Sequence, residues 1–250
     1  LELALPMENY ALKVLLVDAY PRWDSRYLMT MLERDRRVKL TRRYRAIRVP
    51  RGEHELLPES QEELDSYGMI IFGDLKPSEL RSGDQKRIAD FVGRRGGFLV
   101  VLAGPRGLPG GYSLGRIADL LPVKAAAGTS EKGRERPESD EAATIRLKLT
   151  EAGEKHQATM VLDDPALNRK LWPALPGLTW VARGITAKPG ARVLIRTDDP
   201  QGTPVAAISR YGAGRVLYLG TDESWRWRDR LGDRIHQTFW LQVMRWGLGL

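Results

Sequence analysis

The amino-acid sequence predicts an α/β fold in which a mostly parallel sheet is covered by helices on both faces and extended by antiparallel strands near the C-terminus. Near-continuous apolar runs of strand length recur at 12–20, 68–74 and 97–104, as in strands buried on both faces. Amphipathic helical segments separate these runs, and three short strand patterns follow residue 190. We read residues 1–250 as one domain, because a single α/β domain of this length buries a large core.

The N-terminal half is expected to alternate strands and helices. After the first apolar run, a helix carries Leu28 and Leu32 on its inner face, and the polar stretch 38–46 predicts a strand near the sheet edge. Residues with capping chemistry mark the predicted helix starts: Asp24 or Ser25, Ser60 with Glu63, Ser82 with Gln85, Ser113, and Asp233 near the C-terminus. Strands joined through helices in this way form right-handed crossovers and a parallel sheet.

The C-terminal half has a different character. Residues 128–144 are charged and lack apolar periodicity, which predicts an inserted loop. Beyond it, 144–150 alternates apolar and polar residues, and the strand patterns 191–197, 204–211 and 214–220 predict an antiparallel meander, with a hairpin turn at 212–214. A last helix is expected from Asp233, with Ile235, Phe239 and Val243 facing inward and Gly247 ending it.

Composition excludes several classes of site. The chain has no cysteine, so disulfides, thiolate metal ligands and thiol nucleophiles are absent. The net charge is +8 and the pI near 9.8, but the basic residues are scattered and form no nucleic-acid module. No stretch approaches about 18 apolar residues. Because the sequence begins without methionine, we expect a segment of a longer protein, in which any membrane attachment lies outside this chain.

Catalytic motifs are weak in this sequence. The segment 111–115 matches G-x-S-x-G, but a loop separates Ser113 from the preceding strand, so we interpret Ser113 as a helix cap and keep a Ser113 hydrolase only as an alternative. The glycines of 212–214 precede a strand, which excludes a dinucleotide fingerprint. Asp18 and Asp74 end two parallel strands, as in phosphoacceptor receiver domains, but the hydroxyl residue and lysine of those domains are missing. Strand-end carboxylates and a basic nucleic-acid-binding module stay as further alternatives. We expect no metal and no cofactor.

Two segments rich in Arg and Trp follow predicted strand ends. "PRW" (21–23) leaves the first strand, and "DESWRWR" (222–228) leaves a late one. If both strands run in the same direction, the two segments meet at the carboxyl edge of the sheet, where open α/β folds bind ligands. Two tryptophans two residues apart face opposite ways in an extended segment, so one is expected to pack inward. The candidate ligand-binding residues are Arg22, Trp23, Asp222, Glu223, Trp225, Arg226, Trp227 and Arg228. The alternative is a closed Arg/Trp/carboxylate network that only locks this edge.

The same segments carry a family resemblance. "VLLVDAYPRWDSRYLMTMLERD", "GGFLVVLAGP" and "YGAGRVLYLGTDESWRWR" resemble the class I glutamine amidotransferase-like domains of large, membrane-associated bacterial proteins, which often contain von Willebrand A modules. This resemblance covers residues 13–246 and implies a flavodoxin-like three-layer sandwich. The family's enzymes carry a cysteine at the elbow, where this chain reads Gly104-Pro105-Arg106, and a histidine near the later strand end, where it reads 221–223 as Thr-Asp-Glu.

Glutaminase chemistry needs a thiolate and a base, and neither stands at these positions. We therefore expect a non-catalytic binding or scaffolding domain of a larger, membrane-anchored bacterial protein. Its expected partners are a protein, small molecule or glycan at the strand-end edge, together with flanking domains of the same polypeptide. The resemblance favours the extracytoplasmic side.

Overall fold

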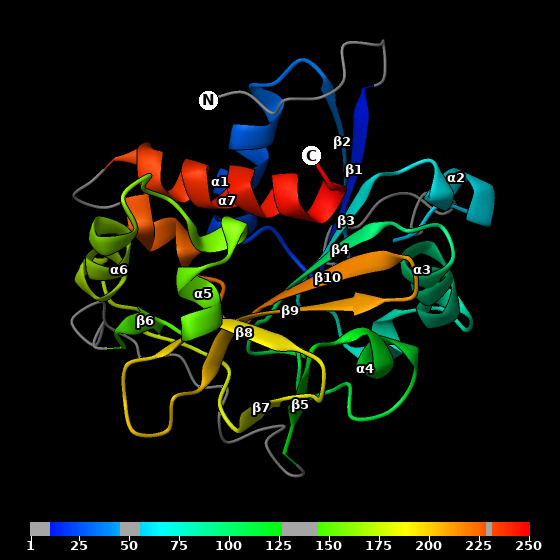
Figure 1. Cartoon of the computed structure of the whole chain (residues 1–250). Coiled ribbons are helices and arrows are strands. Elements are labelled where there is room, and N and C mark those ends of the chain that lie inside the picture. The colour runs from blue at the N-terminus through cyan, green and yellow to red at the C-terminus, as the bar shows by residue number, and fades with distance from the viewer. Residues whose placement is uncertain (1–10, 46–55, 127–144, 229–231) are drawn as a thin grey trace.

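The computed structural model describes residues 11–45, 56–126, 145–228 and 232–250, and the structural statements below concern these ranges. An eight-stranded sheet has the order β2-β1-β3-β4-β10-β9-β8-β6 (Figure 1). Its strands are β1 (Leu12–Asp18), β2 (Val38–Tyr44), β3 (Met69–Phe72), β4 (Phe98–Leu102), β6 (Leu147–Leu149), β8 (Arg192–Thr197), β9 (Pro204–Tyr211) and β10 (Gly214–Leu219). A separate pair consists of β5 (Val123–Ala125) and β7 (Ile185–Ala187).

Helices cover both faces of the sheet. They are α1 (Trp23–Glu33), α2 (Gln61–Asp65), α3 (Asp84–Gly93), α4 (Arg116–Leu120), α5 (Glu151–Glu154), α6 (Pro165–Ala174) and α7 (Asp233–Leu248), with short 3-10 helices η1 (Pro77–Glu79), η3 (Gln157–Thr159) and η4 (Ser224–Arg228). Successive residues of β1 alternate between the two cores: Val14 packs with α1 and α7, and Leu15 packs with α2 and α3. This is the predicted three-layer, flavodoxin-like α/β sandwich.

The sheet topology agrees with the sequence pattern. Strands β1 to β4 and β10 are parallel, because β1 pairs with β2 and β3, and β4 pairs with β3 and β10. The predicted meander β8-β9-β10 is antiparallel, and β6 adds to it along β8. The polar strand β2 stands at the sheet edge, as its composition predicts. Strand β2 lies on one side of β1, and the next strand along the chain, β3, lies on the other side. The strand order therefore reverses at β1, and the topological switch point lies at the carboxyl ends of β1 and β3.

Several predicted helix boundaries are wrong. Helix α1 is capped at Arg22, so Asp24 and Ser25 lie inside its first turn, and α3 starts at Asp84 behind a left-handed Gly83. Gly115, and not Ser113, stands at the N-cap of α4. The Ser60 cap is confirmed, since its hydroxyl accepts the Glu63 amide at 3.0 Å.

The last helix also differs from its prediction at both ends. Gly232 stands at its N-cap, with Asp233 as the first helical residue. Gly247 lies within α7, where it allows close contact with the Phe98 ring, and the helix ends at left-handed Gly249.

Other elements were not expected from the sequence. They are helices α5 and α6 and the strand pair β5–β7, of which only α6 is longer than four residues. The predicted insertion at 128–144 lies outside the described residues. No helix in the described ranges is both long and apolar enough to cross a membrane.

Candidate functional site

The two Arg/Trp segments lie side by side at the carboxyl edge of the sheet. They border a cavity of about 410 Å³, here called the rim pocket, which is lined by Tyr20, Pro21, Arg22, Trp23, Arg26, Asp222 and Trp225. The Trp23 and Trp225 rings come within 6.5 Å of each other, centroid to centroid. Strand direction is the cause, because β1 and β10 are parallel members of one sheet and their exits share an edge.

A buried carboxylate joins the two segments directly. Oδ1 of Asp24 accepts hydrogen bonds from the Ser224 hydroxyl at 2.5 Å and from the Trp225 amide at 3.0 Å. Oδ2 of Asp24 is buried and has no hydrogen-bond partner among the described residues. The pKa of Asp24 is raised to about 7, chiefly by burial; the Ser224 hydrogen bond lowers it, and the nearby Asp222 carboxylate raises it.

Arg22 lies beneath the pocket in a network of paired charges. Its Nε donates to Asp18 at 2.9 Å, its Nη1 donates to the Ala103 carbonyl at 2.7 Å, and Nη1 lies 3.5 Å from the Asp222 carboxylate. Burial alone would lower the pKa of Arg22, but Asp18 and Asp222 raise it above its ordinary value, so the guanidinium stays charged. Arg22 therefore ties the exits of β1, β4 and β10 together.

Glu223 is also committed to the fold. It is 1% exposed, and its carboxylate accepts the Thr179 amide at 2.7 Å, the Thr179 hydroxyl at 2.5 Å and the Trp180 amide at 3.2 Å. Arg226 Nε lies 3.4 Å from the same carboxylate. Thr221 is buried and donates from its hydroxyl to the Trp180 carbonyl at 2.8 Å. Residues 221–223 thus anchor the loop at 179–180 below the rim.

The two tryptophans of the second segment separate as expected. Trp227 is fully buried and packs edge-on against Trp172 and Phe239, whereas Trp225 is only half-buried and borders the rim pocket. The segment is not extended, however, since η4 coils through both residues. Arg22, Glu223 and Trp227 support the site from below, which leaves Trp23, Trp225 and part of Asp222 for contact with a ligand.

The surface beside the rim pocket is aromatic and basic. Trp23 is 55% exposed and stacks on Tyr27 at 5.9 Å, and Tyr27 lies 6.4 Å from Trp225. Each ring carries a guanidinium over it, with Arg26 at 5.3 Å from Trp23 and Arg228 at 3.7 Å from Tyr27.

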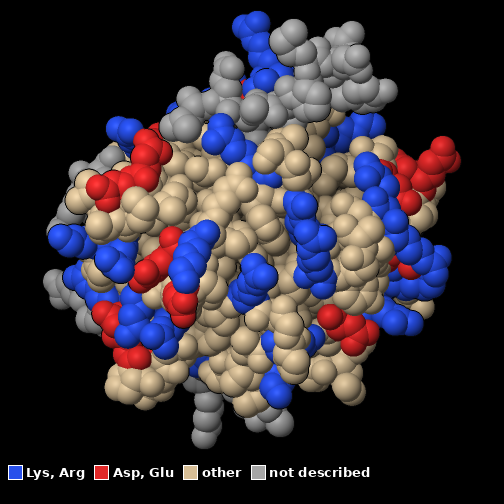
Figure 2. Space-filling model, in the orientation of Figure 1, with Lys and Arg blue, Asp and Glu red and all other residues tan. Residues whose placement is uncertain are grey.

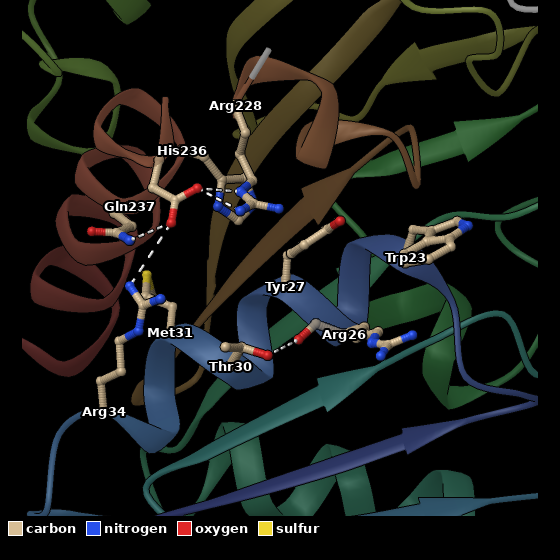
Figure 3. A pocket seen from close by; sticks show the side chains of 10 residues that line it. Trp23, Arg26, Tyr27, Thr30, Met31, Arg34, Arg228, His236 and Gln237 are labelled. Carbon is tan, nitrogen blue, oxygen red and sulfur yellow. Dashed lines mark hydrogen bonds and ion pairs between the residues drawn. The ribbon is translucent and has the colours of Figure 1, made fainter. Parts of the chain in front are cut away.

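A second hollow of about 300 Å³ continues from this surface between α1 and α7 (Figure 3). Asp233 forms ion pairs with Arg228 and Arg34 and accepts a hydrogen bond from Gln237, so ion pairs bridge this hollow. Tyr20, Arg26 and Tyr27 line these cavities but were not predicted as site residues. Helical spacing from Trp23 was the available signal for Arg26 and Tyr27, at three and four residues further along α1.

The backbone amides of the elbow loop after β4 bind a carboxylate of the protein itself. The Asp74 carboxylate accepts three consecutive backbone amides, from Arg106 at 2.7 Å, Gly107 at 2.6 Å and Leu108 at 2.9 Å. Consecutive amides of this kind form an anion-binding nest, and here a fully buried side chain fills it. Asp18 likewise accepts the Ala19 and Asp74 amides as well as the Arg22 guanidinium. The carboxylates of Asp18 and Asp74 therefore both accept hydrogen bonds from groups within the protein.

Ser113 lies apart from a base in the described residues. It is exposed, and no hydrogen bond joins it to His156 or His236, while His54 lies outside those residues. His156 Nδ1 accepts the Ala158 amide, and His236 Nε2 accepts the Trp240 indole N–H at 3.1 Å. Within the same ranges, no group of three or more His, Asp or Glu side chains is placed to hold a metal ion.

Comparisons with known proteins give the fold. No protein-family model and no curated protein matches the chain. Its structure is similar to that of a cytoplasmic protein from Salmonella typhimurium, with 17% identity, 94% of this chain and 98% of that chain covered, and a TM-score of 0.64. A second cytoplasmic protein, from Salmonella typhimurium LT2, has 19% identity, covers 94% and 99% of the two chains, and also gives 0.64. The likeness is one of fold.

Proposed function

We propose that this chain is a non-catalytic binding domain of the class I glutamine amidotransferase-like type, and that its rim pocket holds a sugar ring of a glycan. The observation that carries the proposal is the exposed Trp23 ring, 6.5 Å from Trp225, beside an open cavity whose buried charges are already paired. An exposed aromatic side chain beside convergent polar groups is typical of small-molecule sites.

The absence of catalysis is supported at the two positions where the resemblance expects catalytic groups. In the elbow, the amides of 106–108 already bind the Asp74 carboxylate, so they are not available to stabilise an oxyanion. At the later strand end, Thr221 and Glu223 are buried and bonded to residues 179–180. At both positions, the groups that the family's enzymes use for catalysis are replaced by groups that hydrogen-bond to neighbouring loops of the same domain.

A sugar ring suits the rim pocket better than a charged peptide. The flat indole of Trp23 can stack against the C–H face of a pyranose, while Arg26 donates to its hydroxyls and Asp222 accepts from them. An anionic ligand meets the Asp222 carboxylate at this pocket, and a cationic one meets Arg26. A neutral polyol uses both groups. The resemblance further supports a place for this binding domain in a larger, membrane-anchored protein.

The glycan proposal is tested by calorimetric titration of the purified chain with a panel of mono- and oligosaccharides. Trp23→Ala is expected to weaken binding about tenfold or more, because aromatic contacts of this size are worth about 0.5–1.5 kcal/mol beyond the area they bury. Leu167→Ala is the matched control, since Leu167 is also 55% exposed and lies on α6, outside the rim pocket. Equal loss in both variants, or no saccharide binding by the unmodified chain, would refute the glycan site.

The non-catalytic proposal has its own assay. Ammonia release from glutamine should stay at the uncatalysed rate, and ester substrates should be hydrolysed equally by the unmodified chain and Ser113→Ala. Release of ammonia, or an esterase activity lost in Ser113→Ala, would establish an enzyme instead.

A further inference from the structure

A third cavity lies at the opposite edge of the sheet from the rim pocket. It measures about 330 Å³ and is lined by His156, Gly190, Arg192, Ile208, Ser209, Arg210 and Trp246, here called the arginine pocket. Its β9 residues pair with the beginning of β10, whereas the rim segments leave the strands at their carboxyl ends. The two cavities have no residue in common.

Three arginines from three adjacent strands meet on this face. Ile208 packs in the core beneath α7, so Arg210, two residues along β9, points to the same face. Arg215 of β10 stands directly opposite Arg210, and Arg192 of β8 stands opposite Ile208. In Figure 2, the charged side chains over β9, β10 and the end of α7 are mainly Lys and Arg.

The charges of this cluster are not balanced within the described residues. Arg192 and Arg210 have no carboxylate within ion-pair distance there, and no acidic residue lines the pocket. Arg215 instead donates to the Trp246 carbonyl and lies over the Trp246 ring, with its Cζ 5.7 Å from the centroid. It thereby offsets the negative C-terminal end of α7 beside the pocket.

Like charges directly opposite each other destabilise a sheet, so the Arg210–Arg215 pair costs stability unless an anion lies beside it. His156 adds a hydrogen-bond donor to the lining. His156 accepts the Ala158 amide at Nδ1, which places the proton of its neutral ring on Nε2, a donor.

We propose that the arginine pocket binds a phosphate monoester of a small organic molecule. Two guanidinium groups offer more donors than one carboxylate accepts, and their two positive charges match the three terminal oxygens and double charge of a phosphate group. The Trp246 and His156 rings, 5.4 Å apart, form a wall for the organic part. The volume, at the lower end of small-molecule sites, fits a single small ligand.

The test is calorimetric titration of the whole chain with phenyl phosphate, inorganic phosphate and benzoate at equal ionic strength. Arg192→Gln and Arg210→Gln are each expected to raise the Kd for phenyl phosphate at least about tenfold, since a charge-assisted hydrogen bond is lost. Arg183→Gln removes the same charge from an exposed position outside the pocket and should leave the Kd unchanged. Benzoate should bind at least about tenfold more weakly than phenyl phosphate.

Thermal unfolding gives a second readout that separates a ligand site from a structural role. Without phosphate, Arg210→Gln should unfold at the same or a higher temperature than the unmodified chain, because it relieves the repulsion with Arg215. With phenyl phosphate, the order should reverse. The proposal is overturned if Arg183→Gln weakens binding as much as the pocket variants do, or if benzoate binds as tightly as phenyl phosphate.

Discussion

Replacing Asp24 by Asn should change how stability depends on pH. Burial raises the pKa of Asp24 from 3.8 to about 7, so the folded chain keeps a proton on this group that the unfolded chain loses. Its contribution to stability is complete below pH 3.8 and is lost as pH rises through about 7. A shift of about 3 units, at about 1.36 kcal/mol each, sets the loss at roughly 4 kcal/mol.

Asp24→Asn imitates the protonated acid. Its Oδ1 can accept the same bonds from Ser224 and Trp225, and its amide nitrogen takes the place of the unpartnered Oδ2. Relative to the unmodified chain, the variant should therefore gain about 1.4 kcal/mol per pH unit between pH 4 and 7 and level off above.

The assay is urea unfolding at half-unit pH intervals from 4 to 8.5, with the difference in free energy of unfolding plotted against pH. Asp163→Asn, at an exposed position without an ion pair in the described residues, is the control and should give a flat difference. A flat difference for Asp24→Asn as well would refute the reasoning, because it would mean that Asp24 titrates alike in the folded and unfolded chains.

Three further outcomes are expected. Burial lowers the pKa of His236 to about 3, so the neutral ring stabilises the fold above about pH 6.5, and this contribution is lost as pH falls. In the same urea assay, the free energy of unfolding of His236→Gln should therefore rise relative to that of the unmodified chain as pH falls from 6.5 to 3. Gly247→Ala should cost about 1–3 kcal/mol by thermal unfolding, because the new methyl would stand 2.2 Å from the Phe98 ring; a more stable variant would show that helix propensity outweighs this contact. Asp74→Asn should cost about 2–4 kcal/mol in urea, since an amide oxygen replaces a carboxylate that accepts three amides, and a loss no larger than that of Asp163→Asn would contradict this role.

Much of the sheet could be predicted from the sequence because its strands carry long apolar runs. The runs around Leu15, Ile70 and Val100 are buried on both faces, and this pattern fixed their central, parallel positions. Helix starts were harder to predict. Left-handed Gly83 precedes α3, and Gly115 stands at the N-cap of α4, the role that was predicted for Ser113. Capping chemistry alone does not decide where tertiary packing begins a helix.

The candidate site was predictable in position but not in the role of each residue. Strand direction placed the two Arg/Trp segments together, which needs only the topology. Which arginine is buried depends on the phase of α1: Arg22 at its cap points under the sheet edge, and Arg26, one turn later, stays exposed. The arginine pocket has no motif, because its cluster forms only when β8, β9 and β10 pair.

The placement of β10 has a consequence for synthesis of the chain. This strand stands between β4 and β9, although it comes more than a hundred residues after β4 in the sequence. Until it emerges from the ribosome, the Phe98–Leu102 strand has an open edge that is wholly apolar, which is the kind of segment that pairs with other nascent chains. Translation pauses or truncations before residue 214 should therefore yield aggregates and a need for chaperones, whereas chains extended past residue 219 can close that edge themselves.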